Sequence, residues 1–230
     1  MENKGFSLLE CLIAMSLLAW ILILCEGMFV IQKKTTITVM KDIEQLDTLR
    51  QLYLRLDPLI SRAGFLGMQS LSSDLPITIQ GQIPYSNMPH RATTIHRAKG
   101  KTWEPPLPAA LSNKVVPGTD VFMVEYANTL ALPQSGWFVK ADGEKADIFY
   151  SDTYPEEALY TVLGTWNIIA VYMQKGGELM QKSLLPMADA VNILTGLESF
   201  QCETDGGLLK VTVTYANEPI SIWYGLDNAS

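Results

Sequence analysis

The sequence predicts an α+β protein in which one long N-terminal helix packs on a mostly antiparallel β-sheet. An unbroken apolar run opens the chain, and apolar residues then recur at helical spacing as far as residue 60. Beyond it, short runs of β-branched and aromatic residues alternate with Gly- and Asp-containing turns, a pattern typical of hairpin-linked strands. Because the strands follow the helix and do not alternate with further long helices, we expect α+β and not α/β.

The apolar run from residue 6 to 31 is long enough to cross a membrane. Its strongly polar side chains are Ser7, Glu10, Ser16 and Glu26. As an α-helix it would extend roughly 39 Å, whereas a hydrocarbon core is about 30 Å thick. A removable signal peptide has a shorter apolar core and a small-residue cleavage site, which residues 25–29 do not provide. We therefore expect the segment to be retained.

Glu10 is the unusual residue of this run, because a charged side chain costs about 2.5–3.5 kcal/mol when it is carried to the centre of a membrane helix. Two interpretations are open. In the first, the carboxylate lies in the first helical turn, reaches the lipid headgroups and gains from the positive end of the helix dipole. In the second, it awaits a specific cation. Cleavage after Gly5 would give Phe6 a free α-amine, and the amine and carboxylate of neighbouring copies would neutralise one another.

The chain enters the apolar run through Lys4-Gly5-Phe6-Ser7-Leu8-Leu9-Glu10. This stretch resembles the prepilin signature of type IV pilins and type II secretion pseudopilins. The resemblance implies that a dedicated aspartic peptidase cuts after Gly5 and methylates Phe6. It also implies that Glu10 guides the subunit into a growing filament, which favours the second interpretation of this residue.

The resemblance also implies an organisation and an orientation, which the charges flanking the apolar run do not settle. The expected parts are a cytoplasmic leader at residues 1–5, a transmembrane and assembly half of the helix at 6–31, an amphipathic half at 32–63, and a globular α+β domain of type IV pilin-like fold at 64–230. The globular domain would lie in the periplasm, anchored to the inner membrane by a single pass.

Residues 35–60 are predicted to continue the helix. Apolar side chains at steps of three and four form one stripe, made of Val39, Ile43, Leu46, Leu49, Tyr53, Leu56 and Ile60. We expect this stripe to lie against the sheet. The β-branched stretch at 35–39 is a weak helix former that is expected to flex or partly unwind, and Pro58 is expected to kink or restart the helix.

The helix is predicted to end at residues 61–67, with Gly64 and Gly67 as terminators. Asp57 together with Arg62-Ala63-Gly64-Phe65 and Gly67 resembles a stretch of the PilW-type minor pilins, and so does Gly118-Thr119-Asp120-Val121. The chain departs from that pattern at Met68, where those proteins often carry a cysteine. We interpret residues 61–67 as a structural turn with an apolar anchor, not as a catalytic loop.

The region after residue 117 is predicted to be the sheet. Strands are expected at 120–127, 137–141, 148–151, 166–174, 178–184, 197–202, 208–216 and 220–224, with hairpin turns at Gly176-Gly177 and Asp205-Gly206-Gly207. Short helical pieces are expected from Pro155 to just before Gly164 and at 189–194. Residues 69–117 are predicted to be irregular, apart from a strand at 76–80.

That irregular region carries a basic cluster next to Trp103. Its members are His90, Arg91, His96, Arg97, Lys99 and Lys101. We favour a solvated loop, the alternative being a contact with DNA, lipid headgroups or an acidic partner. The net charge of −7 argues against a general nucleic-acid surface.

Cys11 and Cys25 lie in the apolar run, so Cys202 has no partner in the rest of the chain. Many pilins have a disulfide near the C-terminus, and this chain departs from them there. We expect Cys202 to be buried like an apolar residue, the alternative being an intermolecular disulfide.

The sequence contains no phosphate loop, no Gly-x-Ser-x-Gly, no His-Glu-x-x-His and no Cys-x-x-Cys motif. The two histidines make a poor metal pair, and the acids Asp142, Glu144 and Asp147 are better explained as a polar turn than as a calcium site. We therefore predict no enzyme activity, no catalytic residue, no cofactor and no metal.

The resemblance implies a minor pilin that helps to prime or assemble a type IV pilus, a filament associated with adhesion and motility. Its expected partners are other minor pilins, the major pilin, the prepilin peptidase, the inner membrane and the pilus assembly platform. Its final place would be the extracellular pilus. One alternative is a minor pseudopilin of a type II secretion system, which would share the leader and Glu10. Another is a signal-anchored envelope binding protein, which would keep its N-terminus uncut.

Overall fold

The computed structural model describes residues 8–66, 76–85, 92–129, 133–142, 144–156 and 161–226. The predicted processing residues, Gly5 and Phe6, lie outside these ranges. The chain divides into two units, Met1–Asp47 and Thr48–Ser230. Their boundary lies inside helix α1 (Leu8–Ile60), within the predicted amphipathic half.

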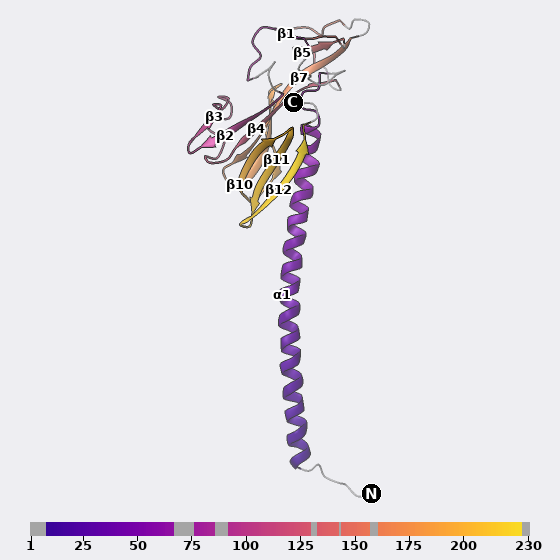
Figure 1. Cartoon of the computed structure of the whole chain (residues 1–230), viewed down its shortest axis with the longest axis vertical. Helices are drawn as coiled ribbons and strands as arrows, with labels where there is room; N and C mark the ends of the chain where they lie inside the picture. Colours follow the sequence, from indigo (N-terminus) through magenta and orange to yellow (C-terminus); the bar gives the residue numbers. More distant parts are fainter. Residues whose placement is uncertain are drawn as a thin grey trace. The chain divides into compact units, whose positions relative to one another are not determined.

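Helix α1 runs without interruption over 53 residues (Figure 1). The stretch expected to unwind is helical. The hydroxyl of Thr35 donates to the carbonyl oxygen of Ile31 at 3.0 Å, and that of Thr38 donates to Lys34 at 3.1 Å. Because each hydroxyl is satisfied by the preceding turn of the same helix, the β-branched residues do not break the helix here. The predicted unwinding is therefore wrong.

The second unit contains a sheet of nine described strands (Figure 1). These strands are β1 (Ile77–Gln80), β2 (Thr93–Lys99), β3 (Thr102–Glu104), β4 (Val121–Asn128), β5 (Gly136–Ala141), β6 (Ala146–Ser151), β7 (Val162–Gln174), β8 (Glu178–Leu185) and β9 (Val191–Leu194). Seven of them lie in the order β1-β6-β5-β7-β4-β2-β3, and β8 and β9 extend the sheet from β7. The pairs are antiparallel, except that β1 runs parallel to β6.

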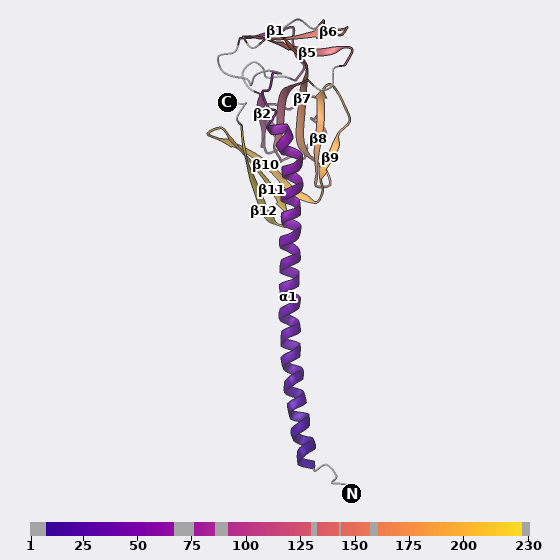
Figure 2. The same cartoon turned by 90° about the vertical axis from the view of Figure 1, so that its right-hand side faces the viewer.

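Strand β7 is the longest strand and organises this sheet. One of its edges pairs with β4, while its other edge pairs first with β5 and then with β8. Strand β9 extends the sheet beyond β8 (Figure 2). The turn between β7 and β8 contains Gly176 and Gly177, so the first predicted hairpin is confirmed.

A separate three-stranded antiparallel sheet closes the described chain. It consists of β10 (Leu197–Asp205), β11 (Leu208–Tyr215) and β12 (Glu218–Gly225). The turn from β10 to β11 contains Gly206 and Gly207, which confirms the second predicted hairpin. Together with α1, these sheets make the unit α+β and mostly antiparallel, as the sequence predicted.

Three local predictions were wrong. Strands β2 and β3 form a hairpin inside the region expected to be irregular. Gly164, expected to follow a short helix, lies within β7. A side chain would be crowded at this position, because an added Cβ would lie 3.2 Å from the Cβ of Ala127. Residues 157–160 of that predicted helix lie outside the described ranges. The segment expected to be a helical turn at 189–194 contains β9, because pairing with β8 overrides its weak local preference.

The last part of α1 forms one wall of a core. Its buried residues are Thr48, Leu52, Leu56, Leu59 and Ile60. They share one apolar core with side chains of β4, of β7 and of the three-stranded sheet. Pro58 lies inside the helix, which does not restart there. The opposite face of the nine-stranded sheet contributes to a second core, which includes Leu111, Trp166 and Tyr172.

The predicted stripe is only partly correct. Leu56 and Ile60 are buried and Leu49 packs at the edge of the core, but Val39, Ile43 and Leu46 are exposed. Tyr53 is 49% exposed and stacks on Tyr224 of β12, with ring centroids 6.0 Å apart. In place of Leu49 and Tyr53, the buried residues of this part of the helix are Thr48 and Leu52, each one position earlier in the sequence.

The turn that ends α1 is hydrogen-bonded to the sheet. The amide of Gly64 donates to the carbonyl oxygen of Glu125 in β4 at 2.9 Å, and the amide of Ala127 donates to that of Phe65 at 2.7 Å. Gly64 has a φ of +73°, which favours glycine. Ala63 is fully buried. The segment therefore anchors the helix, as predicted, while Gly67 lies outside the described residues.

Candidate functional site

Glu10, the predicted assembly residue, lies in the first turn of α1 with its side chain exposed. Backbone amides in the first turn of a helix have no partner within the helix, and the dipole there favours a negative charge. The position therefore suits a carboxylate that meets a cation near the helix start. Its proposed partner, the α-amine of a cut Phe6, belongs to the residues that the structure does not describe.

An apolar surface follows Glu10 along the helix. Every large apolar side chain from residue 8 to 31 is exposed, by 47 to 84%. Helix α1 is long and apolar enough to cross a membrane once, which is compatible with single-pass anchoring. Exposed apolar side chains on all sides of a helix are stable only when lipid or other apolar helices cover them.

The small polar groups of this segment fit apolar surroundings. The hydroxyl of Ser16 donates to the carbonyl oxygen of Ile13 at 2.8 Å. A hydroxyl bonded within its own helix needs no water, so it adds little cost in a membrane. Cys11 and Cys25 are free and exposed on the same surface. Glu10 and Glu26 thus remain the strongly charged groups between residues 8 and 31.

The basic cluster predicted between residues 90 and 101 is not one surface. His90 and Arg91 lie outside the described residues. His96 is buried in β2, where its Nδ1 donates to the carbonyl oxygen of Pro105 at 2.9 Å and its Nε2 lies 3.1 Å from Sδ of Met123. Burial lowers the pKa of His96, which favours its neutral form.

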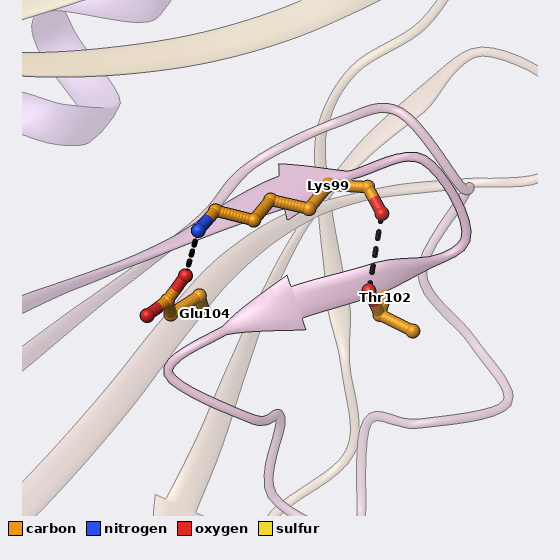
Figure 3. A network of polar contacts seen from close by, with 3 residues as sticks. All are labelled: Lys99, Thr102 and Glu104. Carbon is orange, nitrogen blue, oxygen red and sulfur yellow. Dashed lines mark hydrogen bonds and ion pairs between the residues drawn. The ribbon is translucent and has the colours of Figure 1, made fainter.

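The remaining members belong to the β2–β3 hairpin (Figure 3). Lys99 forms an ion pair with Glu104, while the hydroxyl of Thr102 donates to the carbonyl oxygen of Lys99 at 3.0 Å. Hydrogen bonding and the charge of Lys99 lower the pKa of Glu104. The indole of Trp103 donates to the carbonyl oxygen of Thr119 at 2.8 Å. Lys99 and Trp103 are thus used within the hairpin and its neighbouring turn, which weakens the case for an aromatic and cationic contact surface.

Asp120 joins the two sheets, a role that sequence reasoning missed. Its Oδ1 accepts from the amide of Ala98 in β2 and its Oδ2 accepts from the amide of Cys202 in β10, both at 2.9 Å. Its own amide donates to the carbonyl oxygen of Phe200 at 3.0 Å. The available signal was an acid placed directly before a strand, where a carboxylate often accepts backbone hydrogen bonds.

Cys202 is buried and free, in agreement with its expected apolar-like environment. Burial, with the nearby charge of Asp120, raises the pKa of its thiol. A protonated thiol in a closed core is unreactive.

The acidic turn at residues 142–147 is held by its own backbone. The carboxylate of Asp142 accepts from the amides of Glu144 and Lys145, each at 3.0 Å, and these bonds lower its pKa. This is the geometry of a polar turn. Among the described residues, no group of three or more His, Cys, Asp or Glu side chains is placed to hold a metal ion.

No family model, curated protein or solved structure matches this chain. The functional argument therefore rests on the N-terminal stretch and on the helix that follows it.

Proposed function

We propose that this chain is a minor pilin, a prepilin that is processed after Gly5 and assembled into a type IV pilus through the first half of α1. One observation carries the proposal. Glu10 lies in the first turn of a helix whose apolar side chains are exposed on all sides, and the prepilin-like residues Lys4-Gly5-Phe6 stand just before it. A plain membrane anchor requires the apolar surface but not the acid.

The assembly step follows from electrostatics. A charged carboxylate costs about 2.5–3.5 kcal/mol at the centre of a membrane helix, and Glu10 brings one into the apolar run. The α-amine of a processed Phe6 would lie one helical turn from it, so each mature subunit would present one positive and one negative group. When a second subunit enters the filament at the correct depth, the amine of one and the carboxylate of the other neutralise each other. Glu10 thereby selects the axial register of the incoming helix.

The proposed partners follow from this step. The prepilin peptidase prepares the amine, the inner membrane and the assembly platform hold the subunit, and the helices of other minor pilins and the major pilin replace lipid around α1. The globular unit would then contact sister minor subunits in a complex that primes the filament.

Mass spectrometry of the protein isolated from its own cells tests the processing step. We expect the mature chain to begin at an N-methylated Phe6. An intact Met1 in cells with an active peptidase would contradict the proposal and would favour a signal-anchored envelope protein.

Substitution of Glu10 tests the pairing step, and Glu26 provides a matched control in the same apolar run. We expect Glu10→Gln to lower the amount of the protein in sheared pili by about tenfold or more, because the neighbour's amine loses its counter-charge. Glu26→Gln should stay within about twofold of the wild type, with both variants equally abundant in the membrane.

Normal incorporation of Glu10→Gln into pili would refute the pairing of Glu10 with the neighbouring amine.

Deletion of the gene separates the pilus alternative from the secretion alternative. Loss of pili with normal protein secretion supports the minor pilin, and the reverse outcome supports the pseudopilin.

A further inference from the structure

A cavity of about 270 Å³ lies where three segments of the second unit meet. Its lining residues are Asn113, Lys114, Tyr172, Gln174, Lys175 and Ala190. The segment that carries Asn113 and Lys114 is fixed against the end of β7, because Val115 bridges to Gln174 and the amide of Val116 donates to the carbonyl oxygen of Met173 at 2.9 Å. The cavity is therefore bounded by backbone held in the sheet.

One residue that lines this cavity, Tyr172, carries a buried donor. Tyr172 has none of its surface exposed, and its hydroxyl has no hydrogen-bond partner among the residues that the structure describes. Buried hydroxyls are normally hydrogen-bonded, so the described part of the chain leaves this group one partner short. Burial raises the pKa of the phenol, which keeps it protonated and able to donate.

Positive charge gathers around the same cavity in a chain whose net charge is −7. Lys114 and Lys175 line it, and Lys182 lies close enough to Lys114 for the two charges to interact. The contact with Lys114 and partial burial lower the pKa of Lys182, while the carboxylate of Asp189 acts in the opposite direction. Two ammonium groups held together repel each other unless an anion lies between them.

We propose that this cavity binds the phosphate group of a small phosphomonoester. Lys114 and Lys175 would supply counter-charges, and the Tyr172 hydroxyl and the Asn113 amide would supply further donors. Lysines act as point charges and reach the several oxygens of a tetrahedral phosphate from different segments, whereas a planar carboxylate is better matched by the fork of an arginine. The cavity volume of about 270 Å³ is far larger than the roughly 10–15 Å³ that one water needs, which leaves room for the esterified part.

This site is independent of the proposed role in pilus assembly, since Glu10 and the first half of α1 take no part in it. The same phosphate chemistry has two possible sources, a free metabolite or the headgroup of a phosphorylated lipid.

Calorimetric titration of the full chain in micelles of a neutral detergent tests the site, with ionic strength held constant by sodium chloride. We expect saturable binding of glycerol 3-phosphate with a dissociation constant on the order of 1 mM. Lys114→Gln should weaken it by about tenfold and Tyr172→Phe by about threefold. Lys101→Gln, which removes the same charge from the exposed β2–β3 turn, should leave it unchanged.

Two further measurements make the outcome decisive. The melting temperature of Tyr172→Phe without ligand should equal or exceed that of the wild type, because the lost hydroxyl made no bond within the described chain. A purely structural role of Tyr172 would lower it, and would overturn the assignment of this hydroxyl. Dihexanoyl phosphatidic acid is the second probe. Tighter binding of this lipid than of glycerol 3-phosphate assigns the site to a headgroup, and equal binding assigns it to a free ester.

Absence of saturable binding for both probes up to about 50 mM would overturn the proposal, as would an equal loss of affinity in Lys101→Gln.

Discussion

The two parts of helix α1 differ in where their apolar side chains find contacts. From residue 8 to 47 no side chain is buried, although this part contains most of the helix's leucines and isoleucines. From residue 48 to 60 a stripe of buried side chains forms one wall of the core. Hydrophobicity alone therefore does not define the core of this protein. The second part is covered by strands of its own chain, whereas the first requires lipid or other helices.

Matched leucine truncations test this contrast most directly. Leu56→Ala should lower the free energy of unfolding by about 3 kcal/mol, because Leu56 is fully packed and its removal leaves a cavity. Leu18→Ala makes the same chemical change at a side chain that is 61% exposed, and it should change this free energy by less than about 0.5 kcal/mol. Denaturant titration of the full chain in neutral detergent measures both. Equal losses would mean that the first part also packs within its own chain.

The two sheets are joined by the hydrogen bonds of Asp120, so within the second unit a single polar side chain should also matter for stability. Asp120→Ala leaves the amides of Ala98 and Cys202 without their acceptors and should cost about 2 kcal/mol. Asp120→Asn keeps one acceptor and should cost less. Thermal melts followed by circular dichroism would check the order, and an alanine variant as stable as the wild type would show that the junction does not need this residue.

The smallest effect is expected from His96. Burial lowers its pKa in the folded protein, so below about pH 6.5 the unfolded chain binds protons more readily than the folded one. Its contribution to stability is therefore full above this pH and falls as the pH decreases toward the folded pKa. His96→Gln should make the loss of stability on acidification shallower than in the wild type. Parallel acid-side slopes in denaturant titrations at several pH values would contradict this.

Local signals were sufficient for several elements. The glycine pairs at 176–177 and 206–207 mark tight turns whatever surrounds them, and the hairpins form there. The apolar run and its helical repeat likewise predicted α1. The buried face of α1 was only partly predicted, because Leu49, Leu52, Tyr53 and Leu56 are all apolar. Two neighbouring apolar stripes therefore fit the sequence equally well, and only packing against the sheets selects the one that is buried.

Contacts between distant residues were not predictable in this way. The β2–β3 hairpin was hidden because charged residues interrupt the alternation of its strands. Asp120 binds amides 22 residues before it and 82 residues after it. The cavity at Tyr172 joins three segments, and each has an ordinary composition. These features arise from tertiary pairing, which a single sequence encodes only weakly.

The anchoring of Gly64 and Phe65 to β4 has a mechanical consequence. Strand β4 is interior to its sheet, with β2 on one edge and β7 on the other. A pull along the chain from α1 is therefore transmitted through residues 61–66 to the middle of the sheet, not to a free border. Peeling a border strand breaks hydrogen bonds one at a time, whereas drawing out an interior strand requires many bonds to fail together. Under such a pull the helix should yield before the nine-stranded sheet does. Force spectroscopy with one handle at the start of α1 and the other in the turn after β7, which is also an interior strand, would reveal the order.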